Sequence, residues 1–230
     1  MTEARPLGTL YGVIFAPFVR KVRAVLALKG IDYQQISVMP GAMDASFLAK
    51  SPLSQVPVWE EADFVLPDSS AICAYLERLV PSPMLYPADP RVFASALFWE
   101  EYADSRLVDA GEPIFFERVV RPHVLRQATN EEVVRRNLEE VIPPVFDQLE
   151  SLYLAPGPLC PGGSDAVGVA GGVLDISAIA IWSPIVNLEH VGIAVDAGRW
   201  PRLAAFMEAL NAHPVLQPIV TKERAALGVR

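Results

Sequence analysis

The sequence predicts a protein of two parts, an α/β unit followed by an all-helical unit. Short strand-forming runs alternate with helical periodicity up to residue 80. Residues 81–90, PSPMLYPADP, contain four prolines, which break helices and indicate a linker. From residue 91 onward, apolar residues recur almost throughout at helical spacing. We therefore expect one domain at 1–80, a linker at 81–90 and an all-α domain at 91–230.

The first unit opens with a strand, a helix and a second strand. Leu7 to Val13 is a short apolar run of strand-forming residues between turns. Pro17 suits the first position of a helix, and Gly30 suits its end. Ile31 to Val38 then alternates as a second strand does. This order predicts two parallel strands joined by a right-handed crossover.

A short helix, a hairpin and a longer helix complete the unit. Asp44 or Ser46 is expected to cap the short helix. Val56 to Trp59 and Phe64 to Leu66 are separated by four residues, which favours an antiparallel hairpin. The apolar period from Ser69 to Val80 predicts the closing helix.

The charge and composition exclude some classes of partner. The net charge of −8 and the pI near 4.9 argue against nucleic-acid binding, because no cluster of Lys and Arg can neutralise phosphates. The densest basic stretch, Arg20 to Arg23, is expected to be the solvated face of a helix. The mean hydropathy of +0.29 is high, so an apolar interface such as that of a dimer is expected.

The most apolar stretch, Val167 to Val195, is interrupted by charged and polar residues and by a proline, so we expect a buried helix rather than a membrane span. No signal peptide is visible, and a cytoplasmic location is the expectation. The two cysteines, Cys73 in a helix and Cys160 in a Pro/Gly-rich surface loop, predict no disulfide framework. The three histidines lack ligand spacing, so no metal is expected.

The segment around the hairpin predicts a binding edge. Pro57 stands at the mouth of a strand, where a cis bond is compatible with the chain, and it leaves the backbone N–H and C=O of Val56 without a partner in the sheet. Such an edge pairs with a peptide-like ligand as an added strand does. The helix start at Asp68 and Ser69 offers N–H groups to a carboxylate and a carboxylate to an ammonium.

These motifs resemble the glutathione site of the glutathione transferase family, whose pattern is N-P-x-[GS]-[KQ]-[VI]-P followed by [ED]-S-x-A-I. Here Ser51 to Pro57 is SPLSQVP and Asp68 to Ile72 is DSSAI, and Leu10 to Arg23 is similar to the first strand and helix of such proteins. The resemblance implies a thioredoxin-like first domain, a helical-bundle second domain and a homodimer. It also implies glutathione as co-substrate.

The resemblance further implies roles for individual residues. An electrophile is expected against the helix that carries Trp99, Tyr102 and Arg106, and core packing is the alternative explanation for the aromatic residues on this helix. Asp104 is expected to reach the γ-glutamyl amine across a dimer. The residues expected to bind glutathione are Ala16, Phe18, Gln55, Val56, Pro57, Asp68 and Ser69.

Ala16 departs from the family pattern, because many transferases of this type have Ser there and others have Cys. A hydrogen bond to a charged group contributes roughly 1.5 to 3 kcal/mol, so its loss should raise the pKa of the bound thiol by about one to two units. The backbone N–H of Ala16 or Phe18, at the N-terminus of the helix, can compensate in part. Tyr11 is an alternative hydroxyl donor, and its other interpretation is structural packing.

Two functions follow from the sequence. The first is a transferase that uses the glutathione thiolate on small apolar electrophiles, in detoxification. The alternative is a non-catalytic binding or regulatory module with the same fold, which the alanine at position 16 favours. A thiol-disulfide reductase would need a cysteine at that position, and we set it aside.

In the second unit, Gly111 to Pro113 is expected to kink or interrupt a helix, and Pro143 and Pro144 to bend another. Leu154 to Gly172 is expected to be a long surface loop. Asp175 is expected to open an apolar helix, Ile176 to Leu188. The resemblance implies a capping box whose first residue is Gly172 here, so glycine is the weaker cap and only the reverse half of the box, at Asp175, remains.

Overall fold

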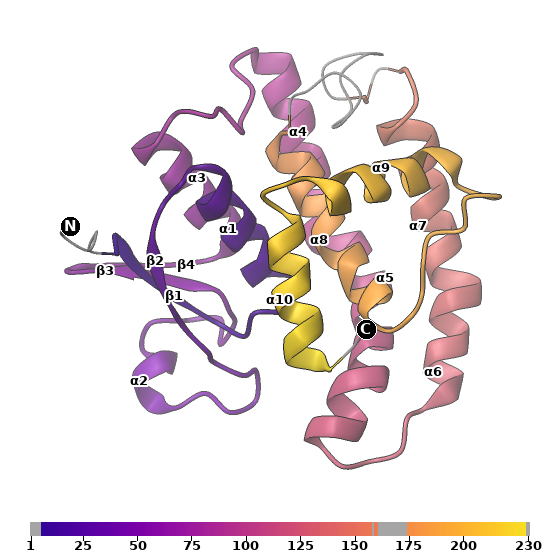
Figure 1. The fold of residues 1–230 in the computed structure, drawn as a ribbon, viewed down its shortest axis with the longest axis horizontal. Coiled ribbons are helices and arrows are strands. Elements are labelled where there is room, and N and C mark those ends of the chain that lie inside the picture. The colour runs from indigo at the N-terminus through magenta and orange to yellow at the C-terminus, as the bar shows by residue number, and fades with distance from the viewer. Residues whose placement is uncertain (1–5, 158, 161–173, 229–230) are drawn as a thin grey trace.

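The structure is a computed structural model that describes residues 6–157, 159–160 and 174–228. In Figure 1 the sheet and its helices lie on the left, and the helices that follow residue 90 lie on the right. The fold class predicted from the sequence is confirmed: a mixed four-stranded sheet with its helices precedes a helical region.

The sheet has the strand order β2-β1-β3-β4. β1 and β2 are parallel, as the crossover through α1 (Pro17–Leu28) predicts, while β3 is antiparallel to both β1 and β4. The hairpin of β3 and β4 is therefore present where it was expected. The strands are β1 (Gly8–Tyr11), β2 (Tyr33–Ile36), β3 (Val58–Glu61) and β4 (Phe64–Pro67).

Helix starts in this unit follow their local sequence. Pro17 occupies the first turn of α1, where its missing N–H costs no bond. Asp44, rather than Ser46, caps α2 (Ala45–Leu48), and its Oδ1 accepts from the Phe47 N–H at 2.8 Å. Asp68 caps α3 (Ser69–Leu79).

The second unit is helical, with π-helical turns between several of its α-helices. Pro113 lies inside a continuous helix, so of the two expected outcomes at Gly111 to Pro113, a kink or an interruption, the interruption does not occur. π-helical turns on both sides of α5, and before α7, shift the backbone hydrogen bonds around the prolines. The elements are α4 (Pro90–Tyr102), η1 (Ala103–Leu107), α5 (Val108–Phe115), η2 (Phe116–Val124), α6 (Glu131–Arg136), η3 (Asn137–Val141), α7 (Ile142–Gln148), η4 (Leu149–Tyr153), α8 (Ile176–His190), α9 (Pro201–Ala212) and α10 (Gln217–Leu227).

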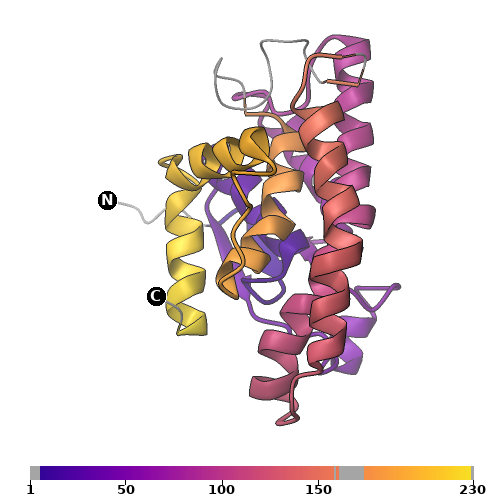
Figure 2. The ribbon, with the colours of Figure 1, turned by 90° about the vertical axis from the view of Figure 1, so that its right-hand side faces the viewer.

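Helix α8 is buried along almost its whole length and packs against α1, α4 and α5. The two units therefore share one hydrophobic core rather than meeting through a thin contact. Asp175 caps α8, with its Oδ1 accepting from the Ala178 N–H at 3.0 Å. Figure 2 shows α6 to η4 running along the length of the molecule, and α10 at the opposite side of the view.

Two expectations concern the loop before α8. Most of residues 154–172, with Gly172, lie outside the described residues. Cys160 is described and is only 8% exposed, so it is buried although the sequence places it in a surface loop. Among the described residues, no helix has both the length and the apolar character needed to cross a membrane.

Candidate functional site

A cavity of about 280 Å³ lies where the first turn of α1, the segment before β3, the start of α3 and the end of α4 meet. Its walls combine backbone edges and helix starts from the first unit with a polar helix face from the second. The lining residues are Phe18, Ser51, Leu53, Gln55, Val56, Pro57, Pro67, Asp68, Ser69, Ser70, Glu101, Asp104 and Ser105.

The turn before β3 is fixed by the buried side chain of Ser51. Its hydroxyl donates to the Gln55 carbonyl at 2.8 Å and accepts from the Gln55 N–H at 2.9 Å. The Val56 to Pro57 peptide bond is cis, and the ladder of β3 begins only at Val58. The N–H and C=O of Val56 therefore stand outside the sheet, beside the cavity.

The start of α3 offers the second group of donors. Asp68 has a φ of +80°, in the left-handed region that Asp tolerates better than most residues, and its Oδ1 accepts from the Ala71 N–H at 2.9 Å. The N–H groups of Ser69 and Ser70, in the first turn, have no intrahelical acceptor. A carboxylate placed in the cavity can accept from them, and the dipole of α3 favours its charge.

The turn between β1 and α1 forms the edge of the site. Gly12 has a φ of +143°, and a Cβ there would stand 2.4 Å from Val19 Cγ2, so the close approach of this turn to α1 requires glycine. The Ala16 N–H donates to the Val13 carbonyl at 3.1 Å, which occupies that donor. The Phe18 N–H belongs to the first turn of α1 and has no intrahelical acceptor, and Phe18 lines the cavity.

A buried lysine lies behind the cavity wall. The Lys21 ammonium is 3.0 Å from Ser70 Oγ and 3.0 Å from Glu100 Oε1, and it also contacts the Asp104 carboxylate. Burial alone would lower the pKa of Lys21, but Asp104 and Glu100 raise it above its usual value. Lys21 is therefore charged, and it orients two side chains of the cavity wall, Ser70 and Asp104.

This burial overturns one expectation. Arg20, Lys21 and Arg23 are 0%, 1% and 4% exposed, so the basic stretch is not a solvated helix face. Each of the three cations has a buried carboxylate partner from the helical region, either Glu100 or Glu223. The partners are distant in sequence, which is why charge alone predicted exposure.

The structure brings most of the residues predicted to bind glutathione to one cavity. Phe18, Gln55, Val56, Pro57, Asp68 and Ser69 line it, whereas Ala16 does not. Asp104 also lines it, in its own chain, with its carboxylate on Lys21 and Ser70. Whether these residues bind glutathione stays a prediction.

The residues predicted to meet an electrophile are not brought to this cavity. Trp99 is 1% exposed, and its indole N–H donates to the Leu159 carbonyl at 2.6 Å. The Tyr102 hydroxyl donates to Gln148 Oε1 at 2.6 Å. Arg106 is exposed and does not line the cavity. The helix turns a different face to the cavity, made of Glu101, Asp104 and Ser105.

Tyr11 also lies away from the cavity lining. Its hydroxyl donates to Glu60 Oε2 at 2.5 Å and accepts from the Lys50 ammonium at 3.1 Å, and its ring packs against Phe47. These contacts agree with the structural interpretation of this residue.

Sequence reasoning missed Ser51, Ser70 and Lys21. Ser51 and Ser70 belong to the motifs that were identified, so their spacing could have indicated them. Lys21 gave no such signal, because its partners are 79 and 83 residues away. Within the described part of the chain, no group of three or more His, Cys, Asp or Glu side chains is arranged to hold a metal ion.

Comparison with known proteins gives consistent matches. Residues 10–84 match the model of the glutathione S-transferase N-terminal domain. A protein of Oryza sativa subsp. japonica, named probable glutathione S-transferase GSTF2, is 31% identical over 220 residues, covering 92% of this chain and 95% of its own.

Solved structures agree with the fold. A glutathione S-transferase from Rhodospirillum rubrum F11 has a TM-score of 0.79 at 23% identity and covers 92% of this chain and 91% of its own. A theta class enzyme from Xanthomonas axonopodis pv. citri, solved with glutathione bound, has a TM-score of 0.73 at 22% identity and covers 94% and 98%. Together with the cis-proline edge and the capped start of α3, the rice relative shows that this chain belongs to the glutathione S-transferase family.

Proposed function

We propose that the protein binds glutathione in this cavity and uses its thiolate on small apolar electrophiles. The observation that carries the proposal is the meeting of three groups in one cavity: the unpaired backbone of Val56, the free N–H groups at the start of α3, and the Asp68 carboxylate. A tripeptide with an ammonium and two carboxylates complements them.

In this arrangement the cysteinyl backbone of glutathione pairs with Val56 as a short antiparallel strand. The γ-glutamyl carboxylate accepts from the N–H groups of Ser69 and Ser70, and its ammonium faces Asp68. Gln55, which lines the same cavity, donates to the glycyl carboxylate. This places the cysteinyl sulfur toward the first turn of α1.

Thiol activation then depends on the backbone. The side chain of Ala16 has no donor, and its N–H is already bonded to Val13. The Phe18 N–H and the dipole of α1 remain to stabilise a thiolate, a contribution of roughly 0.3 to 2 kcal/mol from the dipole. Since one pKa unit corresponds to about 1.4 kcal/mol, we expect a modest lowering of the thiol pKa and modest turnover.

We propose that residues 1–80 form the glutathione-binding domain and residues 91–230 the helical domain. Exposed apolar side chains at Phe64, Val65 and Phe98 support a homodimer, in which Asp104 would also be available to a neighbouring subunit. The low cysteine content fits a cytoplasmic location.

A second candidate is a binding or regulatory module without conjugation activity. Ala16 favours it, because a module that binds glutathione without reaction needs no thiol activation. The two functions share the cavity and differ only in the chemistry at the sulfur.

Calorimetry with glutathione tests the binding step, and conjugation of a generic aryl halide tests the chemistry. Asp68→Asn is the matched variant, because asparagine keeps the cap of α3 and tolerates a positive φ while removing the charge. We expect about tenfold weaker binding, since hydrogen bonds to charged groups contribute roughly 1.5 to 3 kcal/mol. No heat of binding at millimolar glutathione rejects the transferase function, and binding without conjugation from pH 6 to 9 selects the module.

A further inference from the structure

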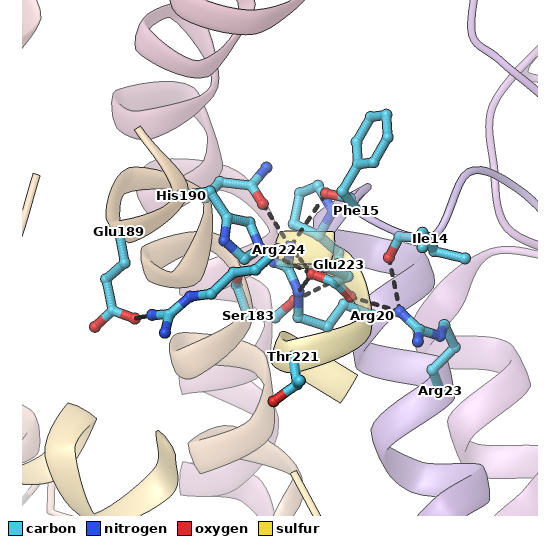
Figure 3. Close-up of polar contacts among 12 residues, drawn as sticks. Ile14, Phe15, Arg20, Arg23, Ser183, Glu189, His190, Thr221, Glu223 and Arg224 are labelled. Atoms are coloured by element: carbon cyan, nitrogen blue, oxygen red, sulfur yellow. Dashed lines mark hydrogen bonds and ion pairs between the residues drawn. The ribbon is translucent and has the colours of Figure 1, made fainter. Parts of the chain in front are cut away.

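A buried carboxylate from the last helix joins two arginines of the first. Glu223 of α10 is fully buried. Its Oε2 accepts from Arg20 Nε at 2.7 Å and its Oε1 from Arg23 Nη1 at 2.5 Å. Figure 3 shows the two arginines converging on this carboxylate between α1 and α10. Each carboxylate oxygen thus fixes one guanidinium.

The same two guanidinium groups hold the turn between β1 and α1. Arg23 Nη1 donates to the Ile14 carbonyl at 2.9 Å, and Arg20 Nη2 donates to the Phe15 carbonyl at 3.2 Å. These carbonyls directly precede Ala16, on the side of the turn that faces the helical domain. Figure 3 shows both bonds as dashed lines.

Helix α8 adds a third attachment to this turn. The Ser183 hydroxyl donates to the Pro17 carbonyl at 2.6 Å, and the Ser183 carbonyl accepts from Arg20 Nη1 at 2.5 Å. Asn187 Oδ1 accepts from Arg20 Nη2 at 2.7 Å. The helical domain therefore contacts the turn directly and through the arginines.

We infer that Glu223 is a positioning residue for thiol activation. By fixing Arg20 and Arg23, it sets the place of the Ile14 and Phe15 carbonyls and so the direction of the Phe18 N–H at the start of α1. This inference rests on the proposed function for its catalytic consequence, but the mechanical link between Glu223 and the turn can be measured without glutathione.

Thiol activation by backbone donors depends on the position of the turn more than activation by a serine hydroxyl at position 16 would. A side-chain hydroxyl rotates to meet a sulfur, whereas a backbone N–H points where the turn directs it. With alanine at position 16, the donors near the sulfur belong to the backbone. A small displacement of the turn therefore misaligns the hydrogen bond to the thiolate, because no side chain can rotate to restore it.

The first test is hydrogen exchange at the Ala16 amide, measured by NMR on the protein without ligand. This amide is bonded to the Val13 carbonyl inside the turn, so its exchange reports on the opening of the turn. In Glu223→Gln we expect exchange about tenfold faster or more, which corresponds to a loss of about 1.4 kcal/mol of local stability. Unchanged exchange in the folded variant overturns the inference.

Glu77→Gln is the matched control. Glu77 also pairs with a buried cation, Lys29 at the C-cap of α1, at 2.7 Å. Lys29 likewise donates to backbone carbonyls, those of Val80 and Pro83. These groups lie at the opposite end of α1 from the turn. We expect Ala16 exchange within about twofold of the unsubstituted protein. A tenfold increase in this control would show only general destabilisation and would overturn the inference.

Two milder variants keep the inference testable if Glu223→Gln does not fold. Arg23→Met leaves Arg20 on Glu223 and removes the Arg23 bonds to Ile14 and to Glu223 Oε1. Ser183→Ala removes only the hydroxyl bonded to Pro17. We expect each to speed Ala16 exchange by a smaller factor, about threefold. If neither does so, the turn is not held from the helical domain.

The second test is the pKa of the bound glutathione thiol, followed by thiolate absorbance. We expect Glu223→Gln to raise it by about half to one unit, and kcat at pH 6.5 to fall by a similar factor of about three to ten. Faster exchange without a change in thiol pKa overturns the positioning role. Faster exchange in a protein that binds no glutathione leaves the link to the turn standing and rejects the proposed function.

Discussion

The Lys21 ammonium lies 3.0 Å from the Glu100 carboxylate, with both side chains no more than 1% exposed. Removing the cation in Lys21→Met leaves a buried carboxylate unpaired. We expect the free energy of unfolding, measured in urea, to fall by about 3 to 5 kcal/mol. Lys222→Met, at an exposed position of α10, should change it by no more than about 0.5 kcal/mol. Equal losses of unfolding free energy in the two variants would mean that the ion pair of Lys21 with Glu100 does not stabilise the fold.

Tyr11→Phe should leave turnover unchanged within about twofold, because the hydroxyl is bonded to Glu60 and Lys50 rather than directed to the cavity. Loss of those bonds should cost about 0.5 to 1.5 kcal/mol of stability. Steady-state kinetics with glutathione and an aryl halide, beside urea unfolding, separate the two effects. A tenfold lower kcat with unchanged stability would make Tyr11 a catalytic residue after all.

The features of the site that the sequence predicted depend mostly on short-range motifs. The cis proline before β3 and the Asp68 cap depend on neighbouring residues, so the cavity edge was visible in the sequence. The environment of Arg20 was not visible, because its carboxylate lies 203 residues away. The burial of Trp99 could not be decided from the sequence for a similar reason, since it depends on packing against Tyr153 and the backbone near Leu159.

Ala16→Ser should increase activity. Residue 16 has the extended backbone of an N-cap, with φ −68° and ψ 131°, which serine adopts readily. The new hydroxyl adds a donor near the proposed thiolate, and we expect the thiol pKa to fall by about one unit and kcat at pH 6.5 to rise up to about tenfold. A thiol titration and kinetics across pH 6 to 9 measure both. An unchanged thiol pKa would place the sulfur elsewhere.

The same substitution should also stabilise α1 by roughly 0.5 to 2 kcal/mol through capping. Urea unfolding without glutathione detects this effect separately. A gain in stability with no gain in activity would mean that the hydroxyl caps the helix instead of meeting the thiol.

The burial of His190 predicts that the stability of the protein depends on pH. Its Nε2 lies 3.0 Å from Glu223 Oε2, and burial lowers the pKa of His190 below its ordinary value despite this carboxylate. Below about pH 6.5 the unfolded chain therefore takes up a proton that the folded chain does not. Stability is lost as pH falls through this window, by at most about 1.4 kcal/mol per pH unit.

His190→Gln should remove this term while keeping a donor to Glu223. The difference in unfolding free energy between the two proteins should therefore shift in favour of the variant between pH 6.5 and 5.5. Contributions of other carboxyl groups, such as those of Asp175 and Glu189, cancel in the difference. Glu223 stays ionised throughout, because Arg20, His190 and Arg23 outweigh its burial and lower its pKa. Parallel pH curves would mean that His190 titrates alike in both states.

The pairing of Glu223 with Arg20 and Arg23 has a consequence for biosynthesis. The ribosome adds Glu223 200 residues or more after the two arginines. Until then the nascent first unit carries both guanidinium groups without their carboxylate, and the turn between β1 and α1 lacks the support that α10 provides. The first unit is translated early, but the carboxylate that pairs with its two arginines is added only with the final helix.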